Sequence, residues 1–148
     1  MINWGRVNND GEIIRQVHTT KKMEFFAEEV EKLTKLNPEM SLLTRGAPTW
    51  PLAWYFRDIP KFKFVKPKKN TLINYDFIFD EITKKGKYLH LKKDYEFKTF
   101  PFRSWWVPDY NKLNFVNFLN YAFTHTPWNK PGIMNILILK KKDLRINF

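Results

Sequence analysis

Two tryptophans and an arginine in the first half of the chain have types and a spacing that suit the binding of a phosphate or a sugar. Trp50, Trp54 and Arg57 are four and three residues apart, so a helix would place them on one face. An arginine beside indole faces can hold a phosphate or stack against a sugar ring. The alternative is a structural cluster, in which the tryptophans pack on a sheet and Arg57 pairs with Asp58 or a backbone carbonyl.

A second group with the same chemistry follows at Arg103, Trp105 and Trp106. Adjacent residues of a strand face opposite sides, so at most one of these tryptophans is fully buried. We expect the other to be a stacking platform or a contact with a membrane-embedded part of a longer protein. We also expect Arg103 or Trp106 to lie near the first group. The candidate ligand-binding residues are therefore Trp50, Trp54, Arg57, Arg103 and Trp106.

Histidines and serines give little support to catalysis or metal binding. His18, His90 and His125 are far apart in sequence and lack carboxylates at ligand spacing, so we expect no metal site. Ser41 and Ser104 have no nucleophile context. We therefore predict no catalytic residue and no cofactor for this chain.

Three acidic residues in the middle of the chain could form a carboxylate cluster. Asp76, Asp80 and Glu81 are close in sequence, but such residues more often balance nearby lysines on a solvated surface. Gly46 stands alone and is not part of a glycine-rich phosphate loop. Neither the acidic residues nor Gly46 indicates a particular ligand.

The charge of the chain favours a polyanionic partner. Lysine and arginine total 26 against 15 acidic residues, which gives a net charge of +11. Such a field attracts nucleic acid, anionic lipid headgroups or lipid phosphates. The densest clusters are 66–69 and 140–142, and nearby aromatic rings could stack on bases. The alternative is an A/T-rich genome, which enriches lysine, asparagine, isoleucine and phenylalanine together.

Compartment signals are absent or ambiguous. The chain has no cysteine, so disulfides and cysteine-based zinc sites are excluded. No apolar run approaches the ~20 residues of a spanning helix. The first residues lack the basic leader and apolar stretch of a signal peptide. Taken literally this describes a cytosolic protein, and the alternative is the soluble part of a longer membrane protein.

The first 45 residues predict a strand, a helix and a strand. A short strand is expected over 12–18, and Thr19 or Thr20 can cap the helix that follows. The helix has one apolar face, and Asn37-Pro38 ends it. A buried strand over 40–44 would complete the unit of a parallel sheet. The apolar face consists of Met23, Phe26, Val30 and Leu33.

The remaining elements predict a single α/β domain. A short helix is expected from Thr49 to about Arg57, followed by a strand over 62–65 and, as one strand or two, 72–73 and 77–79. An edge hairpin over 88–91 and 95–98, a helix over 113–123 and a central strand over 133–139 are expected after them. We predict a mixed, largely parallel, Rossmann-like sheet flanked by two or three helices. Ligands of such sheets bind at the carboxyl ends of the strands.

Three segments carry a resemblance to a known family. They are 49–58 (TWPLAWYFRD), 102–106 (FRSWW) and 126–129 (TPWN). Together they resemble W-P-L-P-W-Y-L-R, L-R-W-W and R-E-P-W-N stretches in the C-terminal tail of flippase-activity-associated membrane glycosyltransferases. These enzymes are related to the dolichyl-phosphate-mannose protein mannosyltransferases. The resemblance extends from about Val17 onward, with departures at Ala53, Phe56 and Ser104.

The resemblance implies a soluble extracytoplasmic domain, spanning residues 1–148, that follows a many-helix membrane portion. In such enzymes the catalytic acid lies in the membrane portion, so this chain would be an accessory, non-catalytic domain that helps position a lipid-linked sugar or acceptor. Its partners would be that lipid-linked sugar or an anionic membrane surface, and the transmembrane part of the same protein. The alternatives are a basic nucleic-acid-binding module and a structural or interaction domain without a ligand.

Overall fold

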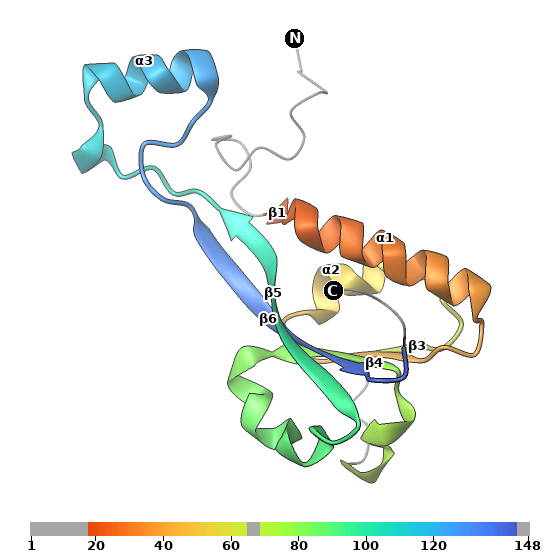
Figure 1. Ribbon diagram of the computed structural model, residues 1–148. Coiled ribbons are helices and arrows are strands. Elements are labelled where there is room, and N and C mark those ends of the chain that lie inside the picture. The colour runs from red at the N-terminus through yellow and green to blue at the C-terminus, as the bar shows by residue number, and fades with distance from the viewer. Residues whose placement is uncertain (1–17, 65–68, 145–148) are drawn as a thin grey trace.

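The computed structural model describes residues 18–64 and 69–144, and one six-stranded mixed sheet lies at its centre (Figure 1). The strand order is β1-β5-β6-β4-β2-β3, and the sheet curls into a half-barrel. The strands are β1 (His18–Thr19), β2 (Leu42–Thr44), β3 (Phe62–Lys63), β4 (Phe77–Glu81), β5 (Tyr95–Trp105) and β6 (Gly132–Lys141). The α-helices are α1 (Lys21–Leu36), α2 (Thr49–Tyr55) and α3 (Phe115–Thr124), and the 3-10 helices are η2 (Lys69–Asn74), η3 (Ile82–Leu91) and η4 (Tyr110–Lys112).

Helix α1 confirms the clearest sequence prediction. The Thr20 hydroxyl oxygen accepts a hydrogen bond from the Met23 N–H at 3.3 Å, which caps the helix. The same hydroxyl donates to the carbonyl oxygen of Pro101 at 2.7 Å, so the cap also ties α1 to β5. The predicted apolar face is buried at Met23, Phe26 and Val30. Helix α1 therefore covers one face of the sheet.

The prediction of a largely parallel, Rossmann-like sheet is wrong. Three of the five strand pairings are antiparallel, and only the two that join β2 to β3 and to β4 are parallel. The cause is the long β5–β6 hairpin, whose partners extend from Tyr95↔Lys141 to Trp105↔Gly132. It places β6 between β5 and β4. Strand β1 pairs with β5 rather than with β2, so the first strand, helix and strand do not form a parallel unit.

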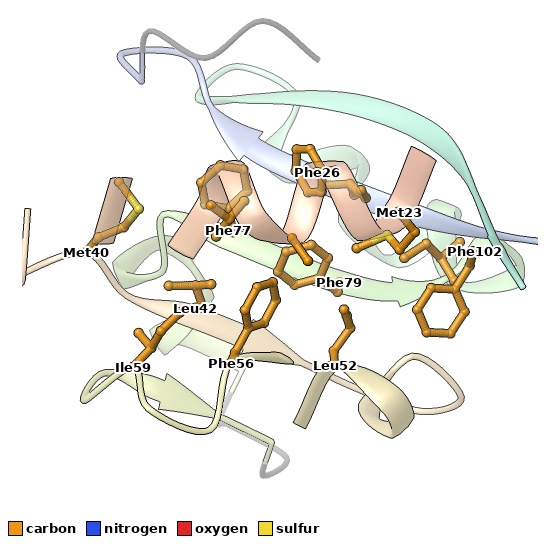
Figure 2. Close-up of a cluster of buried hydrophobic side chains, with 14 residues drawn as sticks. Met23, Phe26, Met40, Leu42, Leu52, Phe56, Ile59, Phe77, Phe79 and Phe102 are labelled. Carbon is orange, nitrogen blue, oxygen red and sulfur yellow. The ribbon is translucent and has the colours of Figure 1, made fainter. Parts of the chain in front are cut away.

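Two apolar clusters lie on opposite faces of the sheet because neighbouring strand residues point to opposite sides. Leu42, Phe77 and Phe79 pack with α1 and α2 on one face, as Figure 2 shows. Leu43 and Ile78 pack with η2 and η3 on the other face. The β2, β4 and β6 strands are thus covered on both sides.

Several shorter elements differ from the sequence predictions. The expected strand at 88–91 is part of helix η3, in which Tyr88 and Leu91 are buried three residues apart. The expected strand at 72–73 lies in helix η2. Strand β5 is eleven residues long, far beyond the predicted 95–98. Thr99 and Pro101 interrupt the apolar alternation after Lys98. Most of the predicted strand 12–18, and residues 66–68 of the first lysine cluster, lie outside the described residues.

The β5–β6 hairpin carries α3 away from the rest of the molecule (Figure 1). We call residues 106–131 the tip, and the remaining described residues the body. The junction is the pair Trp105↔Gly132. A Cβ atom on Gly132 would lie 2.5 Å from a ring carbon of Trp105, so a larger residue there would have to displace the indole. Among the described residues, no helix combines the length and the apolar character needed to cross a bilayer.

Candidate functional site

The tip has a small aromatic centre of its own. Trp106 is only 2% exposed, and its indole N–H donates to the Asn129 side-chain oxygen at 2.9 Å. Its ring lies edge-on to Trp128 at 4.7 Å between centroids and 5.2 Å from Tyr121 of α3. The Trp128 N–H donates to the carbonyl oxygen of Asp109 at 2.9 Å. These contacts hold α3 on the loops around it.

Helix α3 begins and ends on local signals. The side-chain oxygen of Asn114 accepts a hydrogen bond from the Asn117 N–H at 2.8 Å, which caps the first turn. His125 follows the helix with a φ of 56°, and its N–H donates to the Tyr121 carbonyl at 2.8 Å. Such left-handed residues close many helices. Helix α3 is therefore stabilised by contacts within the tip rather than by packing against the sheet.

The outer side of α3 is apolar and open to solvent. None of its residues is buried, and Phe115 and Phe123 are 75% and 81% exposed. Neither apolar cluster of the body includes an α3 residue. The exposed large apolar residues of the tip, which we call the apolar tip surface, are Val107, Tyr110, Leu113, Phe115, Val116, Phe118, Leu119 and Phe123. Exposed apolar side chains gathered in one segment are typical of surfaces that contact a membrane or a partner.

The polar residues of the tip are mostly neutral or basic. Residues 106–131 include one acidic residue, Asp109, and two lysines, Lys112 and Lys130. Asp109 pairs with Lys112 at 3.0 Å, which leaves the charge of Lys130 in excess. No charged residue occurs between Leu113 and Thr124. That gap in charge is the sequence signal that could have indicated a helix without a charged side, and the sequence predictions did not use it.

The first predicted group is only partly assembled. The Arg57 guanidinium lies 4.4 Å from the centroid of the Trp54 ring, and it donates to the Trp54 carbonyl oxygen at 2.9 Å. It also pairs with Asp58 at 3.4 Å. Trp50 has an extended backbone, with φ −112° and ψ 120°, so the helical face argument does not apply to it. Both tryptophans are more than half exposed.

The second predicted group lies in two separate places. Arg103 stands in β5 opposite Thr19 of β1, with its guanidinium 5.2 Å from the Phe102 ring, and partial burial lowers its pKa. Trp106 belongs to the aromatic centre of the tip. Figure 1 shows α3 well apart from α2, so Trp106 and the α2 residues Trp50 and Trp54 do not share one surface. Ligand binding by these five residues stays a prediction.

The structure brings together one polar pair that the sequence did not indicate. The Ser104 hydroxyl and the Nε2 atom of His18 lie 3.0 Å apart across β1 and β5. Ser104 is 1% exposed, so this contact joins the strands and is out of reach of a substrate. In the described ranges, no three histidine or acidic side chains gather closely enough to hold a metal ion.

The three acidic residues of the middle segment have different surroundings. Asp76 accepts hydrogen bonds from the Ser41 N–H at 2.8 Å and from Lys141 at 3.0 Å. Asp80 is buried on the η3 side of β4, and its neighbour Glu81 is half-buried. They are not a single carboxylate cluster.

Comparison with known proteins adds no assignment. No protein-family model, no curated protein and no solved structure matches the chain. The resemblance to membrane glycosyltransferases thus stays a prediction from the three sequence segments.

Proposed function

We propose that this chain is an accessory, non-catalytic domain of an integral-membrane glycosyltransferase that uses polyprenyl-phosphate sugars. The domain lies on the extracytoplasmic side, and its tip contacts an anionic membrane surface. The membrane contact is supported by one observation, the apolar tip surface. The class of enzyme is supported only by the sequence resemblance. In this role the domain helps position the lipid-linked sugar or its acceptor.

The composition of the tip favours lipid over water. Removing a phenylalanine side chain from water contributes about 1.5–3 kcal/mol, and α3 exposes Phe115, Phe118 and Phe123. Tyr and Trp rings are favoured where one end of the ring is apolar and the other is in water, and Tyr110, Tyr121 and Trp128 lie in or beside α3.

The charge of the chain favours anionic lipid in particular. A basic residue near an anionic surface contributes about 1 kcal/mol, and this field weakens within a Debye length as salt increases. The net charge of +11 supplies that attraction over the body and the tip together. Because α3 projects beyond the sheet, it can reach a planar surface before the body does (Figure 1).

The proposal is tested by vesicle cosedimentation with a matched pair of triple variants. Phe115→Ser/Phe118→Ser/Phe123→Ser changes the tip, and Phe25→Ser/Leu36→Ser/Leu89→Ser changes three exposed apolar residues of the body. The unchanged chain should bind phosphatidylcholine vesicles that contain phosphatidylglycerol, and less so at high salt. The tip variant should lose about a thousandfold or more in affinity. The body variant should stay within about threefold.

Three results would contradict the membrane contact. They are absence of binding to any vesicle, equal binding to purely neutral vesicles at all salt concentrations, and equal losses in the two variants. Salt-sensitive binding to single-stranded RNA without vesicle binding would favour the nucleic-acid module instead.

The class of enzyme needs a separate test. An upstream reading frame that encodes several transmembrane helices would support it. Turnover of a polyprenyl-phosphate sugar by the 148-residue chain alone would refute the accessory, non-catalytic role.

A further inference from the structure

A polar pocket of about 420 Å³ lies where the three parallel strands end. Its lining includes Arg45, which follows β2, Phe64, which follows β3, and Asp80 near the end of β4. The strands β3, β2 and β4 run in one direction, so these residues meet at a common carboxyl edge. The volume falls in the range of pockets that hold small molecules.

The two strands that frame this pocket send the chain to opposite faces of the sheet. After β2 the chain enters α2, whose Leu52 packs in the cluster on the α1 side. After β4 it enters η3, whose Tyr88 packs in the cluster on the other side. Adjacent parallel strands with diverging connections leave a crevice at their carboxyl ends, and this is where open α/β sheets bind ligands. The parallel part of a mostly antiparallel sheet thus retains this property.

The carboxylates of the pocket are already satisfied by neighbouring groups. Asp80 accepts hydrogen bonds from the Tyr88 hydroxyl and, at 2.8 Å, from the Glu81 N–H. Burial and the Asp80 carboxylate raise the pKa of Tyr88, so its phenol stays protonated and donates. Glu81 accepts from the Ala47 N–H at 3.2 Å and pairs with Lys84 at 3.5 Å. The acidic groups therefore point to internal partners.

The cations of the pocket keep unused donors. Arg45 gives one N–H to the Tyr88 hydroxyl at 2.9 Å, and its Nε atom lies 3.9 Å from Asp80. A guanidinium has five N–H donors, so this anchoring fixes Arg45 while other donors remain available. Lys84 and Lys87 also line the pocket. Among the described residues, Lys87 has no ion-pair partner. A held arginine with two lysines suits a phosphate group.

We propose that this pocket binds a small molecule through its phosphate group, which Arg45, Lys84 and Lys87 hold, while the exposed Phe64 ring contacts the remainder of the molecule. This site goes beyond the proposed membrane contact and does not depend on the tip. The phosphate can be that of a soluble phosphate compound or of a lipid, since the groups that recognise it are the same.

The test compares two double variants that remove the same charge. Lys84→Gln/Lys87→Gln changes the pocket, and Lys32→Gln/Lys35→Gln changes exposed lysines of α1 that pair with glutamates. Calorimetric titration at low salt uses inorganic phosphate and pyrophosphate, and in a separate arm water-soluble dihexanoyl phosphatidic acid. The pocket variant should weaken binding tenfold or more, and the α1 variant less than twofold.

Each outcome decides the proposal. Pocket-dependent binding of phosphate or pyrophosphate supports a soluble ligand, and pocket-dependent binding of the phosphatidic acid alone supports a lipid phosphate. Absence of binding in both arms, or equal weakening by the two double variants, overturns the site. The tip variant Phe115→Ser/Phe118→Ser/Phe123→Ser should bind the phosphate probes normally, which separates this site from the membrane contact.

Discussion

Helices α1 and α3 both carry apolar side chains three or four residues apart, but they bury them differently. In α1 the positions Met23, Phe26 and Val30 are buried against the sheet. In α3 the positions Phe115, Leu119 and Phe123 are exposed. Periodicity thus indicates that a helix has an apolar side, and it does not indicate whether that side contacts the same chain.

The polar sides of the two helices explain part of the difference. Helix α1 has ion pairs between Glu29 and Lys32 and between Glu31 and Lys35. Such charges are typical of a helix whose polar side faces water. Helix α3 contains no charged residue, and its polar positions are asparagine, threonine and tyrosine. A helix without charge is better suited to an interface that removes it from water.

The largest expected effect lies in the body. Phe77→Ala should lower the free energy of unfolding by about 3–5 kcal/mol, because Phe77 is fully buried and packs against Phe26 and Phe79. Urea unfolding monitored by circular dichroism measures the change. A loss below about 1 kcal/mol would mean that the cluster between α1 and the sheet does not dominate stability. It would contradict the expected difference in stability between the body and the tip.

A smaller and pH-dependent effect is expected for Asp76→Asn. Burial opposes ionisation of Asp76, but hydrogen bonds from Ser41 and Lys141 outweigh it and lower its pKa. A lowered folded-state pKa gives stability that is complete above the unfolded value, about 3.9, and is lost as the pH falls through the folded value. The variant should be about 1–3 kcal/mol less stable at pH 7. The gap should close in acid.

The matching experiment is urea unfolding of both chains between pH 7 and pH 2. A gap that stays constant over this range would show that the Asp76 charge does not stabilise the body.

Trp106→Ala should loosen the tip and spare the body. Trp106 contacts Tyr121 and Trp128 and no residue of either body cluster. Hydrogen exchange at the α3 amides should become faster by tenfold or more, while the free energy of global unfolding changes by about 1 kcal/mol or less. Equal acceleration in the β4 amides would show that the two regions unfold as one unit.

The smallest effect on stability is expected for Phe123→Ala. This side chain is exposed, so the free energy of unfolding should change by no more than about 0.5 kcal/mol. Binding to anionic vesicles should nevertheless weaken by about tenfold. A destabilisation of 2 kcal/mol or more, on the order of a large core truncation, would mean that Phe123 packs within the chain.

Local signals predicted the elements, and pairing decided the sheet. Helix α1, with its Thr20 cap, and the apolar strands β2, β4 and β6 could be found from the sequence. The order of the strands could not, because β1 pairs with β5 more than eighty residues away. The prediction ended strand β5 at Lys98 because Thr99 breaks the alternation of apolar and polar residues and Pro101 is unfavourable inside a strand.

The candidate sites show the same limit. Trp54 and Arg57 are in contact, as their spacing of three residues predicts. Trp106 instead lies in the tip, where it contacts Asn129 and Trp128. The pocket beside Arg45 depends on which strands are parallel neighbours. That information is not present in any one segment of the chain.

The junction between Trp105 and Gly132 determines which insertions, deletions and replacements the chain can accept during evolution. The backbone leaves the sheet and returns to it at two residues that face each other across the hairpin. A gene could therefore lengthen, shorten or exchange the 26 codons between them without shifting any other strand register. The cost would be only that of closing a different loop, which grows slowly with length. The apolar tip surface can in this sense be exchanged as a unit, and Gly132 beside the Trp105 indole is the point at which the tip joins the sheet.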